Sequence, residues 1–225
     1  TTPSWSPRAE VARSAAPPRE EEEEEELNEL GPGVYGHPPR PIFERIAEQR
    51  WRGGLEPAVD ADRVPVEVIE GAIPGDLEGV LYRLGPGRVR VGESLYGHWF
   101  DGDGYITRLE MSGKGQGASY SGRYVRTDRF SSQAAVPDEE GFQRRGAWTN
   151  KPGGVWPNFM RNPTNPANTS PLMWNGKLLA LCEGGPPIEI DPATLETLGE
   201  MPINGLGKGS FFSAHPKVDT FASYK

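Results

Sequence analysis

The sequence predicts an all-β protein preceded by an N-terminal extension. The 225-residue chain contains 29 glycines and 23 prolines, so turns must be frequent and long helices rare. Apolar residues alternate with polar ones in short runs, which is typical of half-buried strands, and glycine-rich turns separate these runs. These observations predict a meander of antiparallel strands, as in a sandwich, a barrel or the blades of a propeller.

Residues 1–41 are predicted to be a disordered extension. The segment is rich in Pro, Ala and Glu and has too few apolar residues to offset the entropy of ordering. Its beginning contains Arg and Ser and is faintly similar to an organelle transit peptide, but the acidic run Glu20–Glu26 is atypical of one. A solvated tail is therefore favoured over an interaction motif, and His37, between Gly36 and Pro38, is given no metal role.

Residues 42–56 are predicted to form a short helical strap. The sequence IFERIAEQR follows Pro41 and places Ile42, Phe43 and Ile46 on one side of a helix. We expect this side to pack on the main domain, residues 57–225.

Within residues 57–225 the pattern predicts short strands with tight connections. In DPATLET, Asp191 and Pro192 suit the first two positions of a type I turn, because Asp can bond the backbone that follows and Pro presets its own dihedral angle. The predicted strand segments are VPVEVIEG (64–71), GVLYRLG (79–85), YITRLEM (105–111), SYSGRYVRT (119–127), NGKLLALCEGG (175–185) and PIEID (187–191).

Charge and composition exclude several classes of partner. The net charge is −8, and the seven glutamates of Glu20–Glu26 account for most of it, so the rest of the chain carries about −1. No basic stripe indicates nucleic-acid binding, and no apolar run of about 18 residues indicates a transmembrane helix. Cys182 is the only cysteine, so no disulfide forms within the chain, which favours a reducing compartment.

The stretch DGDGYITRLE raises the possibility of a calcium loop. In the register of an EF-hand, Asp101, Asp103, Gly104 and Glu110 occupy the third, fifth, sixth and twelfth positions. The first position is Trp99, whose indole offers no oxygen ligand. A structural turn is therefore favoured over a calcium-binding structural protein.

Six motifs, taken together and in order, resemble the carotenoid cleavage oxygenase family over about residues 64–219. They are GAIPGDLEGVLYRLGPG, GHWFDGDGYITRLEM, RYVRTDRF, NPANT, GKLLALCEGGPPIEIDPATLETLG and SAHPKVD. The resemblance implies a seven-bladed β-propeller with a non-haem ferrous ion on its axis, Fe(2+), held by four histidines. It also makes FDGDG a signature turn in which the aspartates bond backbone amides of the turn, and His98 a part of that signature rather than an iron ligand.

The resemblance assigns two site residues. The family's first iron ligand lies in an A-H-P-K segment, which here makes His215 a metal ligand. A neutral imidazole suits ferrous iron, and an all-histidine set leaves positions open for dioxygen. Glu183 of CEGG matches a glutamate that accepts the second N–H of a ligand histidine without touching the metal. The neighbouring Cys182 is interpreted as a small core residue, and no catalytic side chain is assigned.

This chain also departs from the family pattern. Arg83-Leu84-Gly85-Pro86-Gly87 stands where R-N-G-P-N is common. Full members are about twice as long, and the other three ligand histidines have no counterpart here, so the chain is expected to be an N-terminal part of such an enzyme and inactive by itself.

The resemblance implies a dioxygenase that uses O2 to cleave one double bond of a carotenoid or apocarotenoid into aldehyde or ketone products. The rivals are an inactive propeller fragment that acts as a binding module and the calcium-binding structural protein. The expected partners are the lipophilic substrate and O2, with peripheral membrane contact. An intracellular location is expected, plastid or cytoplasmic; the motifs do not specify the double bond or the oligomeric state.

Overall fold

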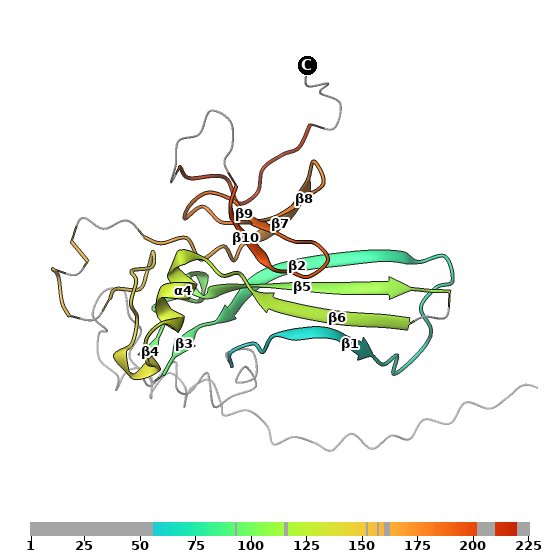
Figure 1. The fold of residues 1–225 in the computed structure, drawn as a ribbon, viewed down its shortest axis with the longest axis horizontal. Coiled ribbons are helices and arrows are strands. Elements are labelled where there is room, and N and C mark those ends of the chain that lie inside the picture. Colours follow the sequence, from blue (N-terminus) through green and yellow to red (C-terminus); the bar gives the residue numbers. More distant parts are fainter. Residues whose placement is uncertain are drawn as a thin grey trace, which may run out of the picture. The chain divides into compact units, whose positions relative to one another are not determined.

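Antiparallel strands make up most of the regular structure in the computed structural model, as Figure 1 shows. The structure describes residues 56–92, 94–114, 117–151, 153–156, 158–159, 163–201 and 210–219. All of them belong to one unit, Arg40–Lys225. The predicted extension at 1–41, with His37, and all but the last residue of the predicted helix at 42–56 lie outside the described residues.

The first sheet has four antiparallel strands in the order β1-β6-β5-β2. Leu84 of β2 pairs with Ile106 of β5, and Thr107 of β5 pairs with Gly122 of β6. The small hairpin of β3 and β4 and the 3-10 turn η1 interrupt the path from β2 to β5. The elements are β1 (Ala61–Val66), β2 (Glu78–Arg88), β3 (Arg90–Val91), β4 (Ser94–Leu95), η1 (Trp99–Asp101), β5 (Asp103–Ser112) and β6 (Gly117–Tyr124).

The second sheet has the order β10-β9-β8-β7 and is also antiparallel. Asn175 and Gly176, with φ angles of 49° and 77°, connect β7 to β8. A two-residue hairpin of type I′ requires positive φ at both positions, so this Asn-Gly pair determines the register of the hairpin. The strands are β7 (Ser170–Trp174), β8 (Lys177–Leu181), β9 (Ile188–Ile190) and β10 (Thr197–Glu200).

One hydrophobic cluster joins the two sheets. Ile106 of β5 packs with Leu178 and Ala180 of β8 and with Ile190 of β9, and all four are fully buried or nearly so. Burying one isoleucine or leucine side chain stabilises the fold by roughly 1.5–3 kcal/mol relative to leaving it exposed. The cluster therefore fixes β8, and the CEGG segment that follows it, against β5.

The strand predicted at 119–127 is too long. Strand β6 ends at Tyr124, and Thr127 caps helix α4 (Asp128–Ala134) by accepting a hydrogen bond from the Phe130 N–H at 3.2 Å. Asp128 in the first turn adds a favourable charge at the helix N-terminus. A short 3-10 turn, η2 (Asp138–Glu140), comes after it.

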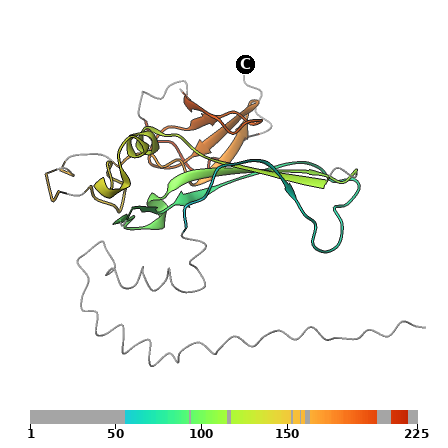
Figure 2. The same cartoon turned by 60° about the horizontal axis from the view of Figure 1, so that its bottom comes forward.

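The strand predicted at 64–71 is wrong at its end. Strand β1 covers Ala61–Val66, and its last pair is Val66 with Ala118, one residue after β6 begins. No strand of the described region pairs with the residues beyond it, and Ile69 is 94% exposed. Figure 2 shows the β1–β2 connection looping away from the sheet. Strands β7 and β10 were not predicted from the sequence. The all-β prediction is confirmed as a class, because strands make up most of the regular structure, while the seven-bladed ring remains a prediction.

Candidate functional site

An apolar cavity of about 660 Å³ lies beside the end of β8. Four aromatic side chains from three separate segments line it: Trp99, Phe100, Trp148 and Phe211. Volumes of this order are typical of small-molecule sites. Both predicted site residues, Glu183 and His215, line the same cavity, so it is the candidate functional site.

The structure brings Glu183 and His215 together across 32 positions of sequence. Glu183 Oε1 lies 3.9 Å from His215 Nδ1, and the two side chains are 67% and 71% exposed. This distance is longer than a hydrogen bond but suits an ion pair when the imidazole is protonated. Because Nδ1 faces the carboxylate, Nε2 is the imidazole nitrogen that remains for another partner.

Buried neighbours hold the two residues in place. Leu178–Leu181 of β8 are buried immediately before Glu183, and Ala214 next to His215 is fully buried. Asn165 supports the turn after Glu183, because its Nδ2 donates to the Pro186 carbonyl at 2.8 Å. Cys182 is 9% exposed and its Sγ accepts from the Gly184 N–H at 3.4 Å, which agrees with its interpretation as a small core residue.

The described residues do not form a complete metal site. No group of three or more His, Cys, Asp or Glu side chains that could hold a metal ion occurs within the described ranges. His215 suits ferrous iron as a single imidazole donor, and Glu183 suits it as a carboxylate that orients the imidazole. A complete all-histidine set would need ligands from outside this part of the chain.

Asp101 organises the aromatic side of the cavity. Its carboxylate accepts hydrogen bonds from the Ala147 and Trp148 N–H groups at 2.7 and 2.8 Å and from the Thr149 hydroxyl at 2.6 Å. The expectation that the aspartates bond amides of their own turn is therefore wrong for Asp101, because these amides lie in a loop 46 and 47 positions further along the chain.

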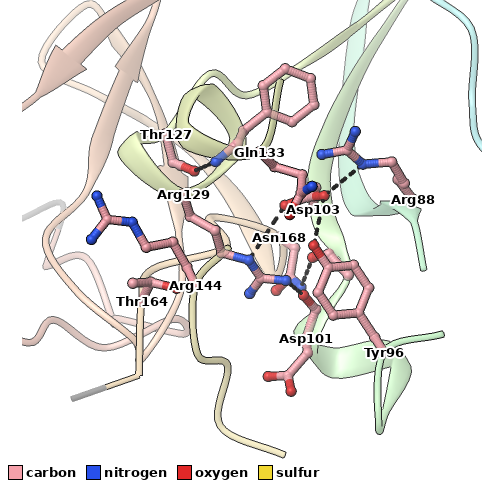
Figure 3. Close-up of polar contacts among 12 residues, drawn as sticks. Arg88, Tyr96, Asp101, Asp103, Thr127, Arg129, Gln133, Arg144, Thr164 and Asn168 are labelled. Carbon is pink, nitrogen blue, oxygen red and sulfur yellow. Dashed lines mark hydrogen bonds and ion pairs between the residues drawn. The ribbon is translucent and has the colours of Figure 1, made fainter. Parts of the chain in front are cut away.

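Asp103 has side-chain partners instead of amides. Its Oδ2 accepts from Arg88 Nε at 2.8 Å and from the Tyr96 hydroxyl at 3.0 Å, while Oδ1 lies 3.5 Å from Arg129 Nε. Figure 3 shows these contacts converging from β2, β5 and α4. Burial raises the pKa of Tyr96 to about 12, and the Asp103 charge acts in the same direction. The network fixes the start of β5.

The EF-hand register is not formed. Asp103 and Glu110 both belong to strand β5, and Glu110 forms an ion pair with Arg108 at 2.8 Å. The Asp101 and Asp103 carboxylates already accept protein donors. This stretch thus forms the structural turn and strand that the sequence analysis favoured over a calcium loop.

His98 has a structural position near the cavity. Its Nδ1 caps η1 by accepting from the Phe100 N–H at 3.1 Å, and its ring lies 4.5 Å from the Phe100 ring and 5.1 Å from the Trp148 ring, centre to centre. Sequence reasoning missed the contributions of Trp148, Thr149 and Asn168. The only available signal was the aromatic and polar composition of GAWT and NPANT, which does not reveal partners so far away in sequence.

The chain matches a known protein family over most of its length. Residues 55–223 match the family model described as retinal pigment epithelial membrane protein. The apocarotenoid-15,15′-oxygenase of Synechocystis is 35% identical over 189 residues, which cover 82% of this chain and 37% of that protein. The chloroplastic carotenoid cleavage dioxygenase 7 of rice is 37% identical and covers 64% of this chain and 24% of that protein.

A further relative and two solved structures extend the comparison. Resveratrol cleavage oxygenase 1 of Chaetomium globosum is 37% identical and covers 67% of this chain and 24% of that protein. A variant of the Synechocystis apocarotenoid oxygenase superposes with a TM-score of 0.67 at 34% identity, over 74% of this chain and 35% of that one. Its cobalt-substituted form gives 0.66 over the same shares. The chain thus spans about a quarter to a third of the length of these relatives.

Proposed function

Because the chain belongs to the family of retinal pigment epithelial membrane protein and the carotenoid cleavage oxygenases, we propose that it is part of an iron(II)-dependent dioxygenase. The reaction cleaves one carbon–carbon double bond of a carotenoid or apocarotenoid with O2 and gives aldehyde or ketone products. The observation that supports this most directly is the joint position of Glu183 and His215 on an aromatic, apolar cavity.

In the proposed mechanism, an imidazole nitrogen of His215 would hold the metal and Glu183 would fix the orientation of that imidazole. Ferrous iron, when bound with open positions, supplies the activation of O2. The carboxylate of Glu183 faces Nδ1 at 3.9 Å, and if the two groups move into hydrogen-bond distance it would accept the Nδ1 proton and leave Nε2 unprotonated as the metal donor. The aromatic side chains would hold an apolar polyene next to this pair.

The decisive experiment replaces His215 in the full-length gene product that contains this sequence. His215→Ala should bring bound iron, measured by atomic emission, to background and abolish cleavage of an apocarotenal, because a ligand is lost. The matched control is His98→Ala, which removes a histidine that caps η1. We expect that control to keep its iron and to lose about 0.5–2 kcal/mol of stability. Wild-type iron content and turnover in His215→Ala would refute the ligand assignment.

A catalytically inactive binding module is the second candidate function. It is favoured by the finding that the described residues hold one imidazole at the site and no group of three metal-binding side chains. The two candidates differ in one measurement. A full-length gene product that binds an apocarotenal but neither retains iron nor consumes O2 would be a binding module.

The substrate class is proposed from the chemistry of the cavity and from the relatives. One relative is named for apocarotenoids and another for resveratrol, both conjugated and largely apolar compounds. Oxygen consumption with carotenoids, apocarotenals and stilbenes side by side would identify the preferred class. We expect the apocarotenals to be consumed fastest.

Peripheral membrane contact is proposed from exposed apolar side chains. Trp156 is 84%, Val155 74% and Phe159 59% exposed, close together in sequence. Among the described residues no helix is long and apolar enough to cross a bilayer. The full-length gene product should sediment together with phosphatidylcholine vesicles. Loss of this co-sedimentation in Trp156→Ser would show that the membrane contact lies at this segment. The proposed location is intracellular, plastid or cytoplasmic; the rice relative is chloroplastic.

A further inference from the structure

The loop Gly146–Thr149 wraps around one buried carboxylate. Asp101 and Thr149 are each only 2% exposed, and the carboxylate binds two consecutive backbone amides and the Thr149 hydroxyl. A hydrogen bond to an ionised acceptor is about twice as strong as one between neutral groups. Three such bonds from one loop to one side chain make Asp101 the main anchor of the loop.

The shape of the loop depends on the same contact. The Gly146 N–H donates to the Thr149 carbonyl at 2.8 Å and closes the turn. A Cβ at Gly146 would come within 2.5 Å of the Asp101 carboxylate. The loop can approach the carboxylate this closely because residue 146 has no side chain.

Asp101 itself is held from the opposite side. Asn168 Nδ2 donates to the Phe100 and Gly102 carbonyls at 2.9 and 2.7 Å, on either side of Asp101. The Arg129 guanidinium donates to the Asp101 carbonyl. Figure 3 shows Arg129 and Asn168 close to Asp101. The carboxylate therefore projects from a backbone that is fixed on both sides.

Trp148 of the loop and Phe100 of η1 form an aromatic wall, on which the His98 ring also packs. Trp148 is 50% and Phe100 62% exposed, and their ring centres lie 5.7 Å apart in an edge-to-face arrangement. Both rings line the cavity that contains Glu183 and His215. Because half of the Trp148 indole is exposed, its position depends on the backbone to which it is attached as well as on the His98 and Phe100 rings.

We propose that Asp101 is a positioning residue that sets the Trp148–Phe100 wall and thereby the fit of an elongated, conjugated apolar substrate. This inference rests on the proposed function, because it assigns the wall to the substrate side of that cavity. Asp101 acts through the amides of Ala147 and Trp148, without contacting the metal or the reacting atoms.

The test uses Asp101→Asn in the full-length gene product. Asparagine has only one acceptor oxygen, so it cannot accept hydrogen bonds from all three donors in the same way as the carboxylate. Hydrogen exchange at the Ala147 and Trp148 amides should therefore accelerate. The KM for an apocarotenal should rise roughly 10-fold, the effect of losing one charge-assisted bond. Iron content and kcat should stay within about 2-fold of wild type, because the ligand pair is untouched.

The matched control is Asp191→Asn. Asp191 Oδ1 also accepts two backbone amides, from Ala193 and Thr194 at 2.8 Å each, but it does not line the cavity. Exchange at residues 193 and 194 should accelerate while KM remains unchanged. A general loosening of the protein would raise KM in both variants, whereas loss of the wall raises it only in Asp101→Asn.

Further variants keep the inference testable if Asp101→Asn fails to fold. Thr149→Val removes one of the three donors and should raise KM by less than Asp101→Asn does. Trp148→Ala removes the indole from the wall but leaves the carboxylate, and should raise KM by at least as much as Asp101→Asn does. The inference is overturned if exchange accelerates in Asp101→Asn or Thr149→Val with KM unchanged, or if KM is unchanged in Trp148→Ala.

The proposed function and this inference fail in different ways. A wild-type protein without turnover would refute the function, and quenching of tryptophan fluorescence by an apocarotenal would then decide the inference. Weaker binding in Asp101→Asn but not in Asp191→Asn would support the wall. Equal binding in all three proteins, or no binding by wild type, would overturn it.

Discussion

At the scale of single residues, we expect Glu183 to act at the candidate site without binding the metal. Its Oε1 lies 3.9 Å from His215 Nδ1, so Glu183→Gln keeps the shape and removes the charge that orients the imidazole. We expect metal affinity or turnover of the full-length gene product to fall about 10- to 100-fold, as is typical of such partners.

Glu189→Gln is the matched control for this prediction. Glu189 forms an ion pair with Lys177 at 2.6 Å on the second sheet and does not line the cavity. Its variant should keep wild-type iron content and turnover. If both variants lost iron or turnover equally, the loss would reflect a general effect on the stability of this sheet. The proposed role of Glu183 in orienting the imidazole would then be refuted.

Tyr96 predicts a loss of stability at high pH. Burial raises its pKa to about 12 from the ordinary tyrosine value of 10.0, and its hydroxyl donates to Asp103 at 3.0 Å. Below pH 10 both the folded and unfolded states keep the proton, so the contribution is fully present. Between pH 10 and 12 only the unfolded state releases it, so the free energy of unfolding should fall by about 1.4 kcal/mol per pH unit from this group.

Denaturant unfolding of the full-length gene product across this pH range measures the effect. Tyr96→Phe should have a shallower pH dependence than wild type above pH 10, although it loses the hydrogen bond to Asp103. Burial also raises the pKa of Tyr124 to about 12, so some dependence should remain in the variant. Parallel curves for the two proteins would show that Tyr96 ionises with an ordinary pKa in the folded state.

At the scale of single residues, the sequence could indicate chemistry but few partners. The family resemblance that includes AHPK and CEGG indicated His215 and Glu183, and their roles at the site remain predictions. The partners of Asp101 could not be inferred, since Ala147 to Thr149 reach the carboxylate only after the chain folds. Asp191 was the opposite case: its bonds to Ala193 and Thr194 are local, and the sequence predicted them.

At the scale of elements, the start of β5 depends on close backbone contact with the 163–169 segment. The Gly104 N–H donates to the Pro166 carbonyl at 2.9 Å, and a Cβ at Gly104 would meet the Ala167 carbonyl oxygen at 2.1 Å. Gly104→Ala must therefore displace backbone. We expect a cost of about 1–3 kcal/mol, as for other overpacked sites, seen as a lower thermal midpoint of the full-length gene product.

Gly79→Ala provides the matched control on the neighbouring strand β2. No atom lies within 4 Å of a Cβ built at Gly79, so the same substitution should change stability by at most about 0.5 kcal/mol. A thermal midpoint for Gly104→Ala that matches the one for Gly79→Ala would show that the segment behind β5 yields easily, and that its contact does not fix the strand.

Strands with an internal alternation were predictable, and elements that depend on a partner were not. YITRLEM lies within β5 because alternation places Ile106 in the core. β1 ends at Val66, one residue short of the beginning of β6, and the limit set by its partner is something that no local pattern in VEVIEG could reveal. Helix α4 had a local signal that was overlooked: Thr127 followed by Asp128 is a typical helix start.

At the scale of the whole molecule, the described sheets leave apolar surface and strand edges uncovered. β1 and β2 are the outer strands of the first sheet within the described region, and Val64, Val80 and Leu81 on them are 47%, 40% and 47% exposed. Exposed edges of this kind favour association with other chains. The solved relative is much longer, since the matched part covers 35% of it.

We therefore predict that residues 1–225 expressed alone are neither an active dioxygenase nor a stable closed propeller. A propeller protects its edges by closing the ring of blades, and a partial ring leaves them open to aggregation. One histidine is also a weak ferrous site, because water or adventitious ligands would fill the other positions. The product should be insoluble or loosely packed, retain little iron after dialysis and cleave no apocarotenal under air. The full-length gene product should instead be soluble, retain its iron and cleave an apocarotenal.

Size-exclusion chromatography, calorimetry and metal analysis of the 225-residue chain decide the matter. A monodisperse protein that melts cooperatively and holds one iron per chain would overturn the prediction. The missing ligands would then have to come from a second chain or from His37 and His98. His98 already caps η1 through Nδ1, so binding iron through that atom would require the cap to break. Phe100→Pro removes the capped N–H and frees Nδ1. A weaker iron site in this variant would therefore argue against ligation through His98 Nδ1.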